Sequence, residues 1–134
     1  MTVYADASAV LKLHVEEEDS PRAVELLGGR QWASGGHTYV EVRRNLARLL
    51  ADDALADARS SFLRAWRDVE VVELTEGLLE RAAGFAEVTG ARALDALHLG
   101  AAERAGAELG MPIVTFDRRL GAAARSLGWR VLPE

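Results

Sequence analysis

The chain has 134 residues, a formal net charge of −5 and no cysteine. This length suits one domain with its own core, the lack of cysteine excludes disulfides and thiolate metal sites, and the negative charge argues against general electrostatic binding of nucleic acid. The sequence leads directly into an expected strand and holds no apolar run long enough to cross a bilayer. We therefore expect one cytoplasmic domain over residues 1–134, with no membrane partner.

Short strands alternate with helices along the chain. We expect strands at 3–5, 31–34, 69–74, 113–116 and 130–132, and helices at 7–15, 21–27, 39–50, 55–66, 75–88, 92–106 and 117–128. Ser20 is expected to cap the second helix, with Pro21 at its first position. This alternation predicts an α/β fold with a mainly parallel sheet of about five short strands, covered by helices on both faces.

Four carboxylates fall where such folds build their sites. Asp6 and Asp117 each end a strand and begin a helix, so that either is alternatively a simple N-cap. Thr38 and Glu41 match a capping box, which places Glu41 in the first turn of a helix. Asp95 lies on a helix that is apolar nearly all round, where a charge is costly unless it is paired or bound to a metal, or favoured by the helix dipole in the first turn.

Together these acids suggest a metal site. Carboxylates at strand ends and helix starts of one sheet are expected to converge, and their repulsion calls for cations. Oxygen ligands without cysteine favour Mg²⁺ or Mn²⁺, which suits phosphodiester hydrolysis by activated water. Thr115 is expected to point its hydroxyl at the same site or to be an ordinary strand threonine, and Ser8 to support the site or simply start a helix. His98 shares a helix face with Asp95 and is expected to hydrogen-bond it from the core.

The motifs that carry these acids resemble a known family. "YADASAVLKL", "TYVEVRRNL", "RALDALHLGAA" and "IVTFDRRLGAAARSLGWRV" are similar, in order and spacing, to the segments of PIN domains of the VapC toxin type. The resemblance covers nearly the whole chain. It implies a PIN-like three-layer α/β/α fold in which Asp6, Glu41, Asp95 and Asp117 are the catalytic, metal-binding acids of an Mg²⁺- or Mn²⁺-dependent endoribonuclease. The segment "SGGHTYVE" departs from many relatives and leaves the contacts of His37 open.

The same resemblance implies partners. A toxin of this type cuts RNA, here expected at selected transfer or ribosomal RNA sites, forms a homodimer, and is covered by an antitoxin whose basic side chain faces the acids. Arg43 and Arg118, which are close in sequence to Glu41 and Asp117, are expected to hold flanking phosphates.

Three rival functions were weighed. The alternative to a toxin ribonuclease is a PIN-like module that sequesters an antitoxin without cutting RNA. An aspartate-dependent phosphatase is disfavoured because Ser8 stands where its second aspartate belongs. A receiver domain is disfavoured because its late lysine is missing, Lys12 being the only lysine.

Overall fold

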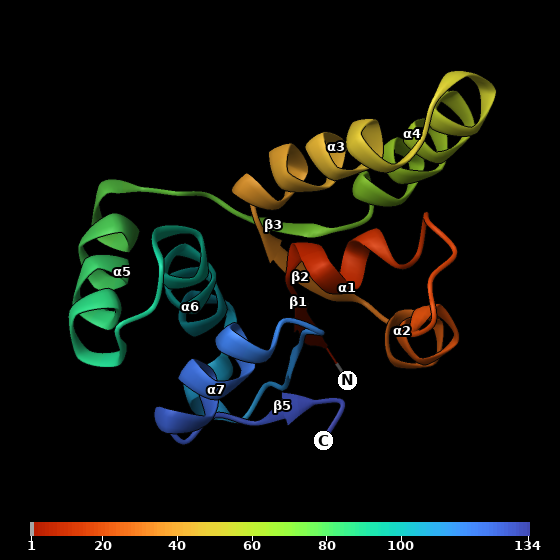
Figure 1. Ribbon diagram of the computed structural model, residues 1–134. Helices are drawn as coiled ribbons and strands as arrows, with labels where there is room; N and C mark the ends of the chain where they lie inside the picture. Colours follow the sequence, from red (N-terminus) through yellow and green to blue (C-terminus); the bar gives the residue numbers. More distant parts are fainter. Residues whose placement is uncertain (1) are drawn as a thin grey trace.

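The computed structural model describes residues 2–134 and contains a parallel sheet (Figure 1). Its strands follow the order β3-β2-β1-β4-β5. A mainly parallel sheet was expected, and every neighbouring pair of strands in this sheet is in fact parallel. The strands are β1 (Val3–Ala5), β2 (Trp32–Gly35), β3 (Glu70–Val72), β4 (Ile113–Val114) and β5 (Val131–Leu132). All five expected strands are present, although β3 and β4 are shorter than expected because only a few of their residues pair.

Helices connect these strands and cover both faces of the sheet. They are α1 (Ala7–Leu11), α2 (Ser20–Leu27), α3 (His37–Leu49), α4 (Asp52–Trp66), α5 (Glu76–Thr89), α6 (Ala93–Ala105), the 3₁₀ turn η1 (Ala107–Leu109) and α7 (Arg118–Ser126). In Figure 1, α3 and α4 form a projecting arm on one side, while α5, α6 and α7 gather on the other. None of the helices in residues 2–134 has the length and apolar character needed to span a bilayer.

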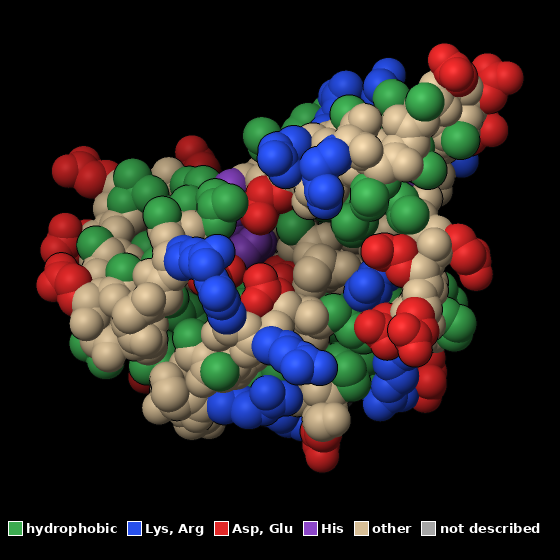
Figure 2. Space-filling model, viewed as in Figure 1, with side chains coloured by type: hydrophobic (Ala, Val, Ile, Leu, Met, Phe, Trp, Pro, Cys, Tyr) green, Lys and Arg blue, Asp and Glu red, His purple; other side chains and the backbone are tan. Residues whose placement is uncertain are grey.

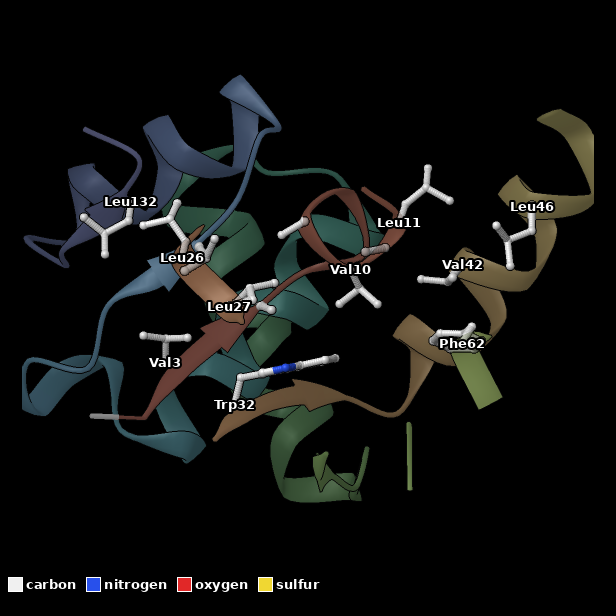
Figure 3. Close-up of a cluster of buried hydrophobic side chains, with 14 of the residues drawn as sticks. Val3, Val10, Leu11, Leu26, Leu27, Trp32, Val42, Leu46, Phe62 and Leu132 are labelled. Carbon is white, nitrogen blue, oxygen red and sulfur yellow. The ribbon is translucent and has the colours of Figure 1, made fainter. Parts of the chain in front are cut away.

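Alternation along the strands produces two separate cores. Val3 and Ala5 face a cluster shared with α1, α2, α3 and α4, which Figure 3 shows around Val10, Leu27 and Phe62. Tyr4 faces the opposite cluster, shared with α5, α6 and α7. Because successive strand residues point to opposite faces, a strand buried on both sides reads as continuously apolar. The fold is therefore the expected α/β/α arrangement of three layers.

Two expected helix caps are wrong. Helix α2 begins at Ser20 itself, after Asp19, and the Ser20 hydroxyl donates to the Val15 carbonyl and accepts from the Glu17 amide, so it closes the preceding loop instead of capping the helix. Helix α3 begins at His37, and the Thr38 hydroxyl accepts from Ser34. The capping box is thus absent among the described residues of α3, and Glu41 lies beyond the first turn.

Candidate metal-dependent active site

The site lies at the carboxyl edge of the three central strands. Asp6 follows β1 directly, Asp117 follows β4 after a short connection, and α3 with Glu41 begins just after β2. Asp95 enters from the first turn of α6, which packs against β2. Figure 2 shows acidic and histidine side chains together in a hollow at the centre of one face, with basic side chains around it. The topology brings all four predicted acids to one edge of the sheet.

Asp6 is buried and held by hydroxyl groups. Its Oδ1 accepts from Ser8 Oγ at 2.7 Å and from the Ala9 amide at 3.1 Å, while its Oδ2 accepts from Thr115 Oγ1 at 2.8 Å. Burial raises the pKa of Asp6, although nearby His98 and these hydrogen bonds act in the opposite direction. Asp6 is therefore the N-cap of α1, and its carboxylate is held in place at the strand edge where a metal-binding role is predicted.

Thr115 and Ser8 tie Asp6 to the loop that carries Asp117. Thr115 Oγ1 accepts from the Asp117 amide at 3.0 Å, and Ser8 Oγ accepts from the Phe116 amide at 2.9 Å. Asp117 in turn caps α7 through one oxygen, Oδ1, which accepts from the Arg119 and Leu120 amides. Among the described residues its Oδ2 makes no hydrogen bond, so one oxygen remains available to a ligand.

A hydrogen-bonded chain orients Glu41. The Gly35 amide donates to the Tyr4 hydroxyl at 3.0 Å, the Tyr4 hydroxyl meets His98 Nδ1 at 2.8 Å, and His98 Nε2 meets Glu41 Oε1 at 2.8 Å. An ionised Glu41 only accepts, so the network assigns the proton of His98 to Nε2, and Tyr4 donates to Nδ1. The expectation that His98 bonds Asp95 is wrong, because its ring reaches the neighbouring helix α3 instead.

Burial keeps Tyr4 and His98, the two side chains that precede Glu41 in this hydrogen-bonded chain, in their neutral forms. It lowers the pKa of His98 to about 4 and raises the pKa of the Tyr4 hydroxyl far above its usual value. Tyr4 is fully buried and His98 is 3% exposed. Both side chains therefore keep one donor and one acceptor each at neutral pH, which is what an ordered relay needs.

The carboxylates lie close enough to repel one another. Burial raises the pKa of Asp95, and the charges of Asp117 and Glu41 raise it further, whereas Arg92 lowers it. The pKa of Glu41 is raised by burial and by Asp117, against the effect of His37. Such a cluster favours a cation, because a bound positive charge relieves both effects at once.

Arginines line hollows on both sides of the acids. One hollow of ≈ 430 Å³ contains Asp95 with Arg92 and Arg119, and another of ≈ 470 Å³ contains Asp117 with Arg118. Arg43 lies elsewhere: it stacks on Tyr39 and lines a hollow on α3 that contains none of the four acids. Arg118 is thus placed beside the site, and Arg43 is not.

Sequence reasoning missed two contributors to this site. The sequence pattern predicts only a strand residue at Tyr4 and assigns no contact to His37, yet the Tyr4 hydroxyl lies 2.8 Å from His98 Nδ1, and His37 Nε2 lies 3.6 Å from Glu41 Oε1. The signal for His37 was its i, i+4 spacing to Glu41 on one helix. Tyr4 had a weaker signal, because a tyrosine in a buried strand needs a partner for its hydroxyl.

The chain belongs to the PIN domain family, whose sequence model matches residues 3–126. It is similar to ribonuclease VapC49 of Mycobacterium tuberculosis, with 36% identity over 98% of this chain and 94% of that protein. Ribonuclease VapC46 of the same organism is 33% identical, over 97% of this chain and 95% of the relative. The crystal structure of M. tuberculosis VapC20, described as a sarcin-ricin loop cleaving toxin, superposes with a TM-score of 0.72 at 20% identity, covering 90% and 94% of the two chains.

Proposed function

We propose that this protein is a metal-dependent endoribonuclease and the toxin of a toxin-antitoxin pair. The observation that carries the proposal is the gathering of Asp6, Glu41, Asp95 and Asp117 at one strand edge, three of them with raised pKa values. Two relatives that match nearly the whole chain at 33–36% identity are named ribonucleases, which supports the same chemistry here.

The donor set of the four acids suits Mg²⁺ or Mn²⁺. Hard, oxygen-only ligands select these ions, and the free Oδ2 of Asp117 and the repulsion around Asp95 leave the site short of positive charge. A divalent ion bound there supplies activation of the attacking water and neutralisation of phosphate charge. The chain itself supplies orientation: Ser8 and Thr115 fix Asp6, and His98 fixes Glu41.

The arginine-lined hollows support an RNA path across the acids. Arg92 and Arg119 lie on one side, and Arg118 lies with Arg22 and Arg125 on the other. The planar guanidinium group of arginine binds a phosphate through two parallel hydrogen bonds. Sequence-specific RNA recognition usually targets single-stranded loops, because their bases can be unstacked from one another. We propose that flanking phosphates of a transfer or ribosomal RNA loop bind in these hollows and that Arg118 binds one of them. Arg43, which lies over Tyr39 away from the acids, is not part of this phosphate site.

Partners follow from the charge of the site. An antitoxin segment with a basic side chain would compensate the uncovered carboxylates, and we propose that it inhibits cleavage by covering them. We further propose that residues 1–134 act as one domain, that two copies form a dimer, and that both operate in the cytoplasm, where RNA is present. Analytical ultracentrifugation of the purified chain tests the dimer directly.

The experiment that tests the function is cleavage of total cellular RNA by the purified, folded chain with Mg²⁺, with Mn²⁺ and with chelator. The Asp95→Asn variant is the control, because it removes one metal-binding charge at nearly constant shape. Discrete fragments that need metal and vanish in the variant support a selective ribonuclease, and their ends identify the target. A lack of cleavage under every condition, by protein free of bound partner, would favour the antitoxin-sequestering module instead.

A further inference from the structure

A second group of metal-ligating atoms lies beside the four acids. One donor atom from each of His37, Glu41 and His98 lies within 4.8 Å of the other two. His37 and Glu41 are one helical turn apart on α3, and His98 reaches them from α6. The Glu41 side chain is 21% exposed, so solvent reaches the cluster from the open side of the site.

His37 lies beside Glu41 without a full hydrogen bond. It is 9% exposed, and within the described part of the chain neither of its ring nitrogens makes a hydrogen bond of ordinary geometry, although Glu41 Oε1 lies 3.6 Å from Nε2 and the backbone of Leu94 is near enough to act on the ring. Buried polar groups are nearly always satisfied, so an imidazole without a full hydrogen bond beside a carboxylate is available to a water molecule or an ion. The ring also contacts His98 in a tilted arrangement, with the ring centroids 4.0 Å apart and an angle of 45° between the ring planes.

The backbone makes room for this ring. A Cβ atom on Gly35 would lie 2.6 Å from His37 Cε1 and 2.7 Å from its Nδ1. Any residue other than glycine at position 35 would therefore push the imidazole out of the cluster. Gly35 also donates its amide to Tyr4, so the same residue seats one histidine and begins the relay that holds the other.

The chemistry of these donors differs from that of the four acids. Two imidazoles and one carboxylate form a ligand set typical of Zn²⁺ sites that keep an open position, whereas Mg²⁺ disfavours nitrogen. Tetrahedral zinc places its ligand atoms about 3.4 Å apart. The separations of 2.8 Å (His98 to Glu41) and 3.6 Å (His37 to Glu41) bracket that value, and all three donor atoms lie within 4.8 Å of one another, so an ion could enter after a rearrangement of side chains alone.

Tyr4 suits the change of tautomer that such binding requires. An ion at His98 Nε2 replaces the proton there, and the neutral ring then carries its proton on Nδ1. That N–H points at the Tyr4 oxygen at 2.8 Å, which then accepts from both His98 and the Gly35 amide, while the hydroxyl hydrogen of Tyr4 turns away from His98. A ligating histidine usually donates its other N–H to such a partner, and losing the partner typically costs 10–100-fold in affinity.

We propose that His37, Glu41 and His98 form a binding site for Zn²⁺, and that occupation of this site inhibits the enzyme. The inhibitory part rests on the proposed function, since zinc on Glu41 Oε1 would draw this carboxylate toward the histidines and place a second positive charge beside the Mg²⁺ site of the four acids. Zinc and magnesium then compete through one shared carboxylate rather than through the whole pocket.

Binding is measured by calorimetric titration of Zn²⁺ into metal-free protein without Mg²⁺, repeated with excess Mg²⁺ to detect the competition, and by the visible absorption of Co²⁺ bound in place of zinc. The His37→Gln variant should bind at least about 100-fold more weakly. The His14→Gln variant should bind like wild type, because His14 is the only other histidine and lies against Ser61 on α4. Gly35→Ala keeps all three donors but displaces the ring, so it should also weaken binding.

Asp95→Asn separates the two proposals. This variant keeps the histidine site and should retain zinc binding, even though it loses RNA cleavage. Equal zinc affinity in wild type and His37→Gln, or loss of zinc binding in Asp95→Asn as large as in His37→Gln, overturns the zinc site. In an active preparation, zinc should reduce Mg²⁺-dependent cleavage by wild type more than by His37→Gln; equal reduction overturns the inhibitory part. Zinc binding without any cleavage would contradict only the ribonuclease.

Discussion

The buried hydroxyl of Tyr4 gives the sharpest test of how the site is held together. In Tyr4→Phe the ring and its packing stay, but both hydrogen bonds of the oxygen disappear. The Gly35 amide is then buried and unpaired, at a cost of about 1–3 kcal/mol, and the lost bond to His98 adds about 0.5–1.5 kcal/mol. We expect the free energy of unfolding to fall by about 2–4 kcal/mol, a large share of the 5–15 kcal/mol of a typical domain.

Denaturant unfolding of wild type and variant measures this difference. Tyr39→Phe is the matched control, since the chain has two tyrosines and the Tyr39 hydroxyl contacts only the exposed Arg43 within the described residues. The control should stay within about 0.5 kcal/mol of wild type. RNA cleavage should also fall in Tyr4→Phe, because Glu41 loses an oriented partner. A Tyr4→Phe effect no larger than that of Tyr39→Phe would refute the relay from Gly35 to Glu41.

Three further predictions concern charge. In chelator, Asp95→Asn should unfold at a higher temperature than wild type, because the substitution relieves the repulsion from Glu41 and Asp117. Saturating Mg²⁺ should remove or reverse that difference, because it stabilises wild type more than the variant. A variant that is less stable than wild type in chelator would contradict the repulsion. RNA retention on filters should be poor in chelator and recover with Mg²⁺, given the net charge of −5, whereas tight binding without metal would contradict this expectation. Burial, aided by Arg64, lowers the pKa of His14 from 6.5 to about 4. As the pH falls, the unfolded chain therefore takes up a proton before the folded chain does, and the stability that neutral His14 contributes above pH 6.5 is lost between pH 6.5 and 4. The stability of wild type relative to His14→Gln should fall by about 1–2 kcal/mol over that interval after solvent screening, and a constant difference would refute this prediction.

The fold could be predicted from local patterns because they agree with one another. Short apolar strands separated by amphipathic helices are compatible with only a few chain topologies. Asp6 and Asp117 are favoured N-cap residues, and they mark the starts of α1 and α7. The family motifs added the order of the acids. The order of the strands in the sheet, and the assignment of each helix to one face of the sheet, depend on long-range packing. The hydrophobic periodicity of the sequence does not encode such packing.

The details of the site were harder to predict, and the failures have a common cause. Thr38 matched a cap by spacing, but the buried Ser34 hydroxyl bonds it and the helix starts two residues earlier than expected, at His37. His98 matched Asp95 by spacing on α6, but Glu41 on another helix lies within 2.8 Å. In both cases a tertiary partner replaced the local one, and a single sequence contains no direct signal for such a partner.

The clasp between Asp6 and Thr115 has a consequence for how the protein is made. These two residues are 109 positions apart, and the second follows β4. A ribosome therefore releases Asp6, Glu41 and Asp95 well before the segment that completes their site. The cluster of four acids therefore cannot assemble on a growing chain until β4 and the residues that follow it have been synthesised.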